Sequence, residues 1–373
     1  MTSLTIAAVG DVMLDRRVLS PRVFHYFPDV SSSGLYEGLT RFPFVYSRES
    51  VDWLASLDRD VSGVHATSHA AQSRLLPSPD EASAPDYPFL QINRTLLQSD
   101  IVFGNLECPL SRNGRRMTND ACYAADPVFA SSMARAGFRV VSLANNHCLD
   151  HGETAFSDTL NVLEENGIVV VGAGRTLEAA RTAAVFTVNG VSVAFLAYSM
   201  TGPEWVYATD NESGVAPMNP LVAGQDIARI RENVDLVILS VHWGSEGRST
   251  PWPRQVELAR HLVDAGADAV LGHHSHVPGS VEVYRGRPIL YSLGNFIFGH
   301  DHPNWSDNFI ARLHVQERRL GRLELIPIRG RYQPAVLNDA AAMRFHSHMT
   351  EISARFSTSL RYDPPVSIVD LQP

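Results

Sequence analysis

The chain has 373 residues, of which 40 are acidic and 31 basic, so its formal net charge is −9. Its 45% hydrophobic and 19% charged residues are typical of a globular protein, and the length allows two domains or one large α/β unit. No apolar run approaches the ~18–20 residues that span a bilayer, and no basic region precedes a long apolar stretch at the N-terminus. We therefore expect a cytoplasmic protein that does not bind membranes.

All 31 basic residues are arginine, because the sequence contains no lysine. This excludes enzymes that need a Schiff-base lysine, including those that use pyridoxal phosphate, and it excludes a P-loop lysine. An acidic chain without a basic run also argues against nucleic acid as a partner. The three cysteines have no C-x-x-C spacing, which fits a reducing compartment and excludes a zinc knuckle.

Short apolar runs, each ended by turn residues, predict a series of buried strands. They cover residues 4–9, 100–103, 139–143, 168–171, 191–197, 236–241, 269–271 and 289–292. Continuous runs of this kind are typical of strands covered on both faces. Helical patterns at 156–166 and 255–265 each end at a glycine. The alternation of strands and helices predicts an α/β sandwich.

Two segments depart from this alternation. Residues 20–99 combine Ser/Pro-rich clusters with aromatic islands and are too apolar for a disordered linker, so we expect an insertion that forms a cap over the site. Residues 303–373 contain a predicted strand pair and a helix near 340–356, which would complete the sandwich. We expect residues 1–373 to form a single domain around these parts.

Polar side chains gather where the predicted strands end. They are Asp11, Asn105, Glu107, Asn145, Asn146, His147, His242, His273, His274 and His276. Mixed nitrogen and oxygen donors from separate strands are what a divalent ion of the Mn, Fe or Zn type accepts. In extended backbone His274 and His276 would point the same way and share the ion.

Each of these residues could also have a purely structural role. His242 could be a hydrogen-bonded core histidine, Asp11 an N-cap, Asn146 part of a turn, and Glu107 the partner of an arginine. For any one residue taken alone, the structural role is the stronger interpretation. Their joint occurrence at matching strand ends favours a metal site.

Several sequence blocks together resemble the CapA-like proteins of the calcineurin-like metallophosphoesterase superfamily, which are known from capsule and poly-γ-glutamate biosynthesis. The blocks are GDVMLDR, GNLECPL, SLANNHCLDHG, VHWGSE, GHHSHVPGSVEVYRGRPILYSLGNFIF and ELIPI, in this order up to about residue 330. The resemblance implies a four-layer α-β-β-α sandwich with a metal site at the strand ends. It implies six metal ligands: Asp11, Glu107 in the bridging position, Asn146, His242, His274 and His276.

The first motif departs from the superfamily pattern. Phosphoesterases of this superfamily have Asp-x-His there, whereas Met13 stands two residues after Asp11. One metal position therefore lacks an imidazole. Two-metal hydrolysis needs both ions about 3.5–4 Å apart. The departure predicts one firmly bound ion and argues against a tightly bound second ion and efficient hydrolysis of phosphate esters.

A single metal with a neighbouring acid/base can also remove a proton from the Cα next to a carboxylate. His147 is the candidate acid/base, Asp150 at i+3 could orient its ring, and Asp11 is a candidate second carboxylate. The altered first motif, the aromatic segment 24–53 and the expected lack of a membrane anchor resemble the soluble epimerases that invert the C-terminal residue of lasso-peptide precursors.

That resemblance implies a metal-dependent isomerase of ribosomal peptide biosynthesis. Its substrate would be the C-terminus of a precursor peptide, with a leader-binding protein as partner and no pyridoxal phosphate. Two alternatives stay open: a metallophosphoesterase or other hydrolase of a small ester, and a CapA-like protein of polymer biosynthesis that acts as a scaffold. The basic loop at residues 112–116 could steer an anionic substrate or could be an ordinary solvated loop.

Overall fold

The computed structural model describes residues 3–15, 84–118, 122–298, 307–330 and 332–371. They belong to one compact unit. Of the expected insertion 20–99, only residues 84–99 are described, and they contribute Phe89, Ile92 and Leu96 to the hydrophobic core. The cap that we expect from residues 20–83, including the aromatic segment 24–53, lies outside the described residues.

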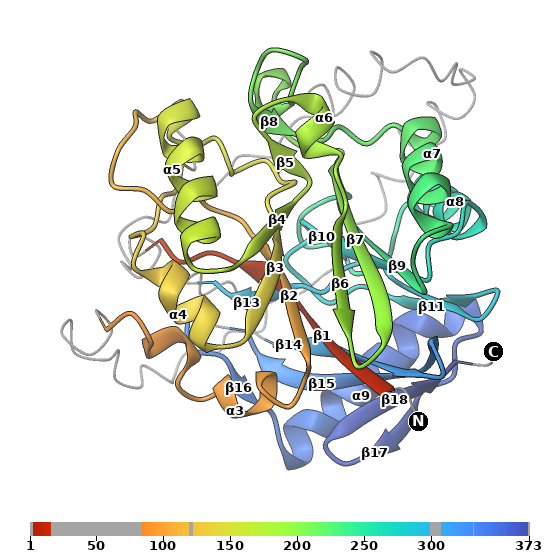
Figure 1. The fold of residues 1–373 in the computed structure, drawn as a ribbon. Coiled ribbons are helices and arrows are strands. Elements are labelled where there is room, and N and C mark those ends of the chain that lie inside the picture. The colour runs from red at the N-terminus through yellow and green to blue at the C-terminus, as the bar shows by residue number, and fades with distance from the viewer. Residues whose placement is uncertain (1–2, 16–83, 119–121, 299–306, 331, 372–373) are drawn as a thin grey trace, which may run out of the picture. The chain divides into compact units, whose positions relative to one another are not determined.

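The larger sheet contains ten strands within the described residues (Figure 1). Its order is β17-β18-β15-β14-β1-β2-β3-β4, with β13 beside β1 and β16 beside β15. The neighbours β1 to β4 are parallel, whereas β14, β15, β16, β17 and β18 pair antiparallel. The bounds are β1 Ser3–Val12, β2 Ile101–Leu106, β3 Phe138–Ser142, β4 Val169–Val171, β13 Asn295–Ile297, β14 Asp307–Gln316, β15 Arg319–Arg329, β16 Ala335–Val336, β17 Arg361–Asp363 and β18 Val366–Asp370.

The smaller sheet has the order β11-β12-β10-β9-β7-β6. Its central neighbours β7, β9, β10 and β12 are parallel, and the strands at both edges are antiparallel. The bounds are β6 Ala184–Val188, β7 Val191–Ser199, β9 Leu236–His242, β10 Ala269–His273, β11 Val281–Tyr284 and β12 Arg287–Leu290. A separate pair joins β5 (Ala173–Gly174) to β8 (Gly214–Val215).

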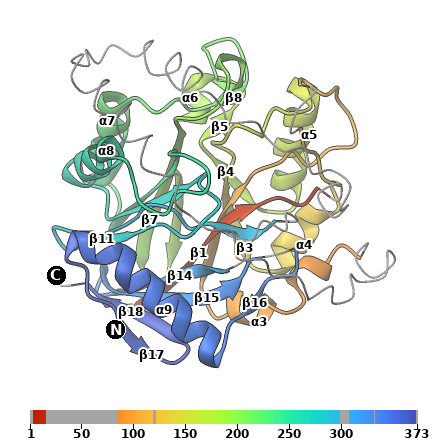
Figure 2. The same ribbon diagram turned by 180° about the vertical axis from the view of Figure 1, so that it is seen from behind.

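Helices cover the outer faces of the two sheets. In Figure 1, α4 and α5 lie beside β2, β3 and β4, whereas α7 and α8 lie beside β9 on the other side. Figure 2 shows α9 crossing the C-terminal strands β15 and β18. The helix bounds are η2 Tyr87–Phe89, α3 Asn93–Leu96, α4 Phe129–Arg135, α5 Gly152–Glu165, α6 Leu177–Ala180, η3 Glu204–Val206, α7 Pro220–Arg231, α8 Pro253–Asp264, α9 Asp339–Ser353 and η4 Ala354–Phe356.

Alternating side chains of β9 show how these layers pack. Leu236 and Ile238 belong to the core between the sheets, whereas Val237 and Leu239 belong to a second core beneath α7 and α8. Both faces of the strand are therefore buried, which explains its continuous apolar sequence. The expected four-layer α-β-β-α sandwich is confirmed.

The core between the sheets depends on aromatic contacts. Phe195 of β7 is fully buried and stacks on Phe103 of β2, with 5.7 Å between ring centroids. We expect Phe195→Ala to lower the free energy of unfolding by about 3–5 kcal/mol, because it leaves a cavity between the two sheets. Urea denaturation measures this loss. Val185→Ala on the exposed face of β6 is the control, with an expected change within about 0.5 kcal/mol; equal losses in both variants would contradict this packing.

Every apolar run that we expected to be a strand lies at a strand of the structure, with bounds shifted by a few residues. The two expected helices correspond to α5 and α8, which begin earlier than predicted, at Gly152 and Pro253. The C-terminal segment forms the hairpin β14–β15 and then α9. Among the described residues, no helix combines the length and the apolar character that crossing a bilayer requires.

Candidate metal centre

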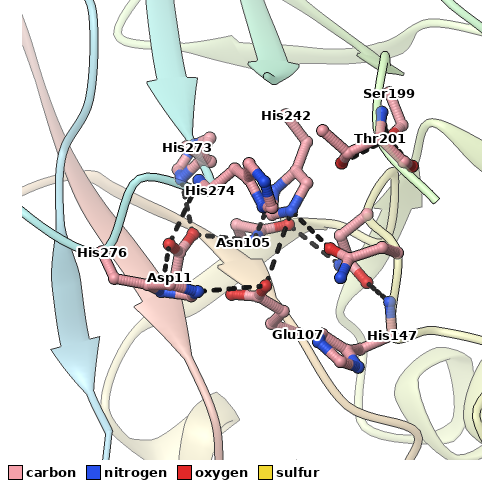
Figure 3. A network of polar contacts seen from close by, with 12 residues as sticks. Asp11, Asn105, Glu107, His147, Ser199, Thr201, His242, His273, His274 and His276 are labelled. Atoms are coloured by element: carbon pink, nitrogen blue, oxygen red, sulfur yellow. Dashed lines mark hydrogen bonds and ion pairs between the residues drawn. The ribbon is translucent and has the colours of Figure 1, made fainter. Parts of the chain in front are cut away.

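The polar strand ends from both sheets meet at one level of the sandwich. In the larger sheet Asp11 of β1 is in register with Asn105 of β2, and in the smaller sheet His273 of β10 is in register with His242 of β9. These positions all lie at the carboxyl ends of parallel strands, where functional groups of α/β proteins gather. Figure 3 shows their side chains converging between the strands.

Two glycines allow β1 to approach the segment before β13 closely. The backbone N–H of Asp11 donates to the carbonyl of Gly294 at 2.9 Å. A Cβ at Gly10 would lie 1.8 Å from that same carbonyl oxygen, so any side chain there would force the two segments apart. The glycine at position 10 therefore helps to fix Asp11 beside Asn295, its partner in the register between β1 and β13.

The backbone of the His-rich loop differs from our expectation. His274 and His276 have φ angles of 89° and 59°, so the segment is in the left-handed region rather than extended. Non-glycine residues rarely adopt this conformation, and such strain is concentrated at functional sites. The two rings still lie close together, with their centroids 6.1 Å apart. The prediction that the two rings lie close together was therefore right, but the extended backbone on which it rested was wrong.

Glu107 lies at the centre of the polar cluster. Its side chain is fully buried, and neither carboxylate oxygen has a hydrogen-bond partner among the described residues. Its Oε1 has longer contacts to His242 Nε2 at 3.5 Å and to His276 Nε2 at 3.9 Å. Ligand atoms of Glu107, His274 and His276 all lie within 4.8 Å of one another. A buried carboxylate without donors is costly, and a divalent cation among these nitrogen and oxygen atoms would offset that cost.

Asn146 and His242 extend this cluster on one side. His242 Nε2 and Asn146 Oδ1 are 2.8 Å apart, and the ring centroids of His242 and His274 are 4.8 Å apart. Asn146 and His242 therefore belong to the same cluster as Glu107 and His274. The structure brings together all six residues that we predicted as ligands, and their function as ligands stays a prediction.

Asp11 lies on the other side of the cluster with its two oxygens engaged. Oδ1 accepts from Asn105 Nδ2 at 2.8 Å and lies 3.1 Å from His273 Nδ1. Oδ2 accepts from the backbone N–H of His274 at 3.3 Å and lies 3.3 Å from His276 Nδ1. These contacts fit an orienting or ligating carboxylate better than a base that must gain a proton.

Burial and neighbouring charges set the protonation of the cluster. Burial, followed by the charge of Asp11, raises the pKa of Glu107 well above its ordinary value. Burial and the nearby His276 lower the pKa of His274 to about 3, and burial and His274 lower the pKa of His242. Burial alone would lower the pKa of His276, but Glu107 and Asp11 raise it to about 10. The pKa of Asp11 stays well below its ordinary value because hydrogen bonds from His273 and His276 outweigh its burial.

His147 and Asp150 form a dyad at the edge of the cluster. His147 Nδ1 lies 2.8 Å from Asp150 Oδ2, and that oxygen also accepts the backbone N–H of Tyr123 at 2.8 Å. The Tyr123 ring packs edge-on against the imidazole, with centroids 4.9 Å apart. Asp150 therefore fixes the ring through Nδ1, which leaves Nε2 as the atom for proton transfer. The predicted pairing of these two residues agrees with the structure, and their catalytic role stays a prediction.

Four polar residues for which we predicted no role hold the others in place. Asn145 Nδ2 donates to Asn105 Oδ1 at 3.0 Å, and His276 Nδ1 lies 2.8 Å from Asn295 Oδ1. With the contact of His273 to Asp11, these bonds orient the rings and carboxylates of the cluster, as partners of metal ligands do. Asn105, Asn145 and His273 stand at predicted strand ends, but their types gave no reason to separate them from ligands. For Asn295, the only sequence feature that pointed to the site was its position directly after Gly294, at the end of an apolar run.

The basic loop at residues 112–116 gives little support for substrate steering. Its residues are exposed, and Arg112 forms a bidentate pair with Asp126 at about 3.0 Å. The contacts agree with an ordinary solvated loop.

The family described as "Bacterial capsule synthesis protein PGA_cap" matches residues 5–300. The chain belongs to this family. The capsule biosynthesis protein CapA of Bacillus anthracis is 34% identical over 251 residues, which cover 65% of this chain and 61% of that protein. The PGA biosynthesis protein CapA of Bacillus subtilis (strain 168) is 31% identical over 272 residues, which cover 72% of each.

The alignment therefore spans about three fifths of the length of the Bacillus anthracis protein. Among solved structures, the 5'-nucleotidase precursor from Thermus thermophilus is 16% identical, with a TM-score of 0.43, over 69% of this chain and 49% of that one. Membership in the capsule synthesis family confirms the CapA-like resemblance. It does not assign the epimerase subgroup.

Proposed function

We propose that this member of the capsule synthesis family is a metal-dependent acid/base enzyme. The observation that supports this proposal is Glu107, a buried carboxylate that has no hydrogen-bond donor among the residues the structure describes and lies among the side chains of His242, His274 and His276. A structural role would require hydrogen-bond donors to Glu107, since buried polar groups are almost always paired. A ligand role explains why the chain keeps such a costly arrangement.

Under this proposal each group has a distinct task. Asn146, His242 and His274 on one side, and Asp11 and His276 on the other, would hold a divalent ion of the Mn, Fe or Zn type with Glu107 between them. When bound, such an ion supplies positive charge that stabilises negative charge on a substrate oxygen. His147 holds or gives up a proton at Nε2, while Asp150 fixes its ring through Nδ1.

Hydrolysis of an ester is the reaction that this geometry supports best. Hydrolysis needs an attacking water, which a bound ion would activate, and one group to protonate the leaving oxygen, which His147 with Asp150 would provide. Inversion of a carbon centre needs a second proton-transfer group on the opposite face, and the oxygens of Asp11 are already occupied by four contacts. One acid/base dyad beside the cluster therefore favours a hydrolase.

Removal of the metal tests the proposal. We expect EDTA to abolish release of p-nitrophenol from p-nitrophenyl esters, and Mn²⁺ or Zn²⁺ to restore it, because the ligands remain in place without the ion. His274→Ala should not be restored by added metal. His348→Ala on the exposed face of α9 is the matched control and should respond like the wild type. Hydrolysis that is unaffected by EDTA would contradict metal dependence.

Epimerisation of a peptide C-terminus is the second candidate. It is favoured by Met13, which is fully buried where the superfamily has an imidazole, and by the absence of lysine, which excludes pyridoxal phosphate. We propose for it a precursor peptide as substrate and a leader-binding protein as partner. In D₂O, His147 would take the Cα proton and deuterium from solvent would replace it, which mass spectrometry detects as a gain of one mass unit. Lack of exchange in any C-terminal peptide, with metal present, would remove this candidate.

A non-catalytic role in polymer synthesis is the remaining alternative. The relatives' names refer to capsule biosynthesis, PGA biosynthesis and an accessory protein of polyglutamine synthesis, and an accessory protein need not turn over a substrate. Complementation of a deletion strain separates this alternative from an enzyme. Full complementation by a His242→Ala/His274→Ala variant would favour the scaffold, and loss of complementation would favour the enzyme.

A further inference from the structure

Five arginines line a cavity of about 350 Å³ that is remote from the metal centre. The cavity includes Asp235 and Asp268, which directly precede β9 and β10. His242 and His273 end those same strands. Because a strand rises about 3.3 Å per residue, the seven residues of β9 separate the cavity from the metal centre by roughly 20 Å. A ligand in this cavity cannot touch the Glu107 cluster.

Two hairpin turns, one from each sheet, supply four of the arginines. The β11–β12 turn of the smaller sheet carries Arg285 and Arg287, and the β14–β15 turn of the larger sheet carries Arg318 and Arg319. Arg285 and Arg318 have left-handed φ angles of 50° and 65°. Such turn positions favour Gly, Asn or Asp, so local propensity does not explain arginine at either one.

Asp268 positions two guanidinium groups from beneath the cavity. It is 1% exposed, and its Oδ2 accepts the backbone N–H of Val237 at 2.8 Å. The same carboxylate pairs with Arg231 and, at 2.9 Å, with Arg287. These arginines are only about one-third exposed, at 36% and 33%. Each guanidinium has five N–H donors, so the pairing with Asp268 leaves donors for a ligand.

The other pairs of this cavity are weak. Arg318 lies 3.5 Å from Asp235 and is 60% exposed, and Arg285 pairs with Asp264 while 68% exposed. Exposed pairs of this kind contribute about 0–1 kcal/mol, so these side chains can turn toward an anion at little cost. Five arginines against two aspartates give the cavity lining an excess of three positive charges, in a chain whose net charge is −9.

We propose that this cavity binds a small ligand that carries two or more carboxylate or phosphate groups. The planar guanidinium fork matches both groups through paired hydrogen bonds. The volume is in the range of small-molecule sites, which starts at about 300 Å³. Four of the arginines come from the two turns, and the fifth, Arg231, ends α7. A ligand with a single anionic group would therefore engage only some of them.

Isothermal titration calorimetry on EDTA-treated, dialysed protein tests this proposal. The probes are tripolyphosphate and citrate, which distinguish phosphate from carboxylate, with acetate as the singly charged comparison. We expect at least one of the two multivalent probes to bind about tenfold or more tighter than acetate. Failure of both to bind better than acetate would overturn the proposal.

Variants locate the binding. Arg318→Ala/Arg319→Ala changes an exposed turn and should weaken binding of the multivalent probe about tenfold or more. Arg322→Ala, which removes an arginine that pairs with Glu324 on β15, is the matched control and should bind like the wild type. Glu107→Gln should also bind like the wild type, because the cavity is remote from the metal centre. Equal binding by the turn variant and the wild type would overturn the proposal.

Discussion

His147→Ala is expected to bind a divalent cation as tightly as the wild type and to lose about 10²- to 10⁴-fold in turnover, which is the range for removal of a general acid/base. The imidazole engages Asp150 through Nδ1, whereas Glu107 supplies the carboxylate of the cluster that has no hydrogen bond from any described residue. Removal of the imidazole should therefore leave the ligands intact. Steady-state kinetics and metal titration on the same preparation measure both quantities.

Asp150→Asn separates orientation from charge in this dyad. The amide can still bond to His147 Nδ1, but it no longer favours the charged imidazole. We expect a smaller loss of turnover than in His147→Ala, because the ring stays oriented although its protonated form loses a negative partner, and steady-state kinetics on the two variants measure the difference. A His147→Ala protein that binds no metal would contradict the acid/base role and make His147 a ligand.

Glu107→Met is expected to stabilise the metal-free protein and to abolish its stabilisation by metal. Within the described part of the chain the wild-type carboxylate is buried without a hydrogen bond, and replacement of buried ionic groups by apolar side chains of similar volume is often neutral or stabilising by about 1–4 kcal/mol. A ligand at 100 times its dissociation constant adds about 2.7 kcal/mol to the wild type, and the variant should lose this gain. Urea denaturation with EDTA and with saturating Mn²⁺ measures the free energy of unfolding of the wild type and of the variant under both conditions.

The sign of each change distinguishes a ligand from a structural carboxylate. If Glu107 stabilised the fold through its contacts with His242 and His276, Glu107→Met would be less stable than the wild type under both conditions. Glu282→Met is the comparison, since this buried carboxylate is paired with Arg260 and accepts from Tyr291. We expect it to lose stability, because it leaves the arginine and the hydroxyl without their partner.

The strands could be predicted from sequence because burial on both faces leaves a strong signal. In β9 the apolar residues run almost without alternation from Leu236 to Val241, and a run this short between turn residues is typical of a buried strand. The helix starts were less accurate, since α5 begins at Gly152, ahead of the apolar pattern that marked it. Residues 16–83, which follow β1 in the sequence, lie outside the described residues.

The convergence of the site could also be predicted, because the carboxyl ends of parallel strands share one edge. What the sequence could not show is how each polar group is used. Asp11 and Glu107 are both carboxylates at strand ends, yet Asp11 has both oxygens occupied by four contacts, whereas Glu107 has no hydrogen bond to the residues that the structure describes. Two of the four contacts of Asp11 come from His274 and His276, whose left-handed backbone the spacing alone does not specify.

Metal content measured by elemental analysis tests the central claim most directly. Wild-type protein and His242→Ala/His274→Ala would each be dialysed to equilibrium against Mn²⁺ or Zn²⁺ and then analysed. We predict at least one ion per chain in the wild type and less than about a tenth of that in the variant, because the variant lacks two imidazoles that we propose as ligands. Equal metal content in the two proteins, or none in either, would contradict a metal centre at Glu107.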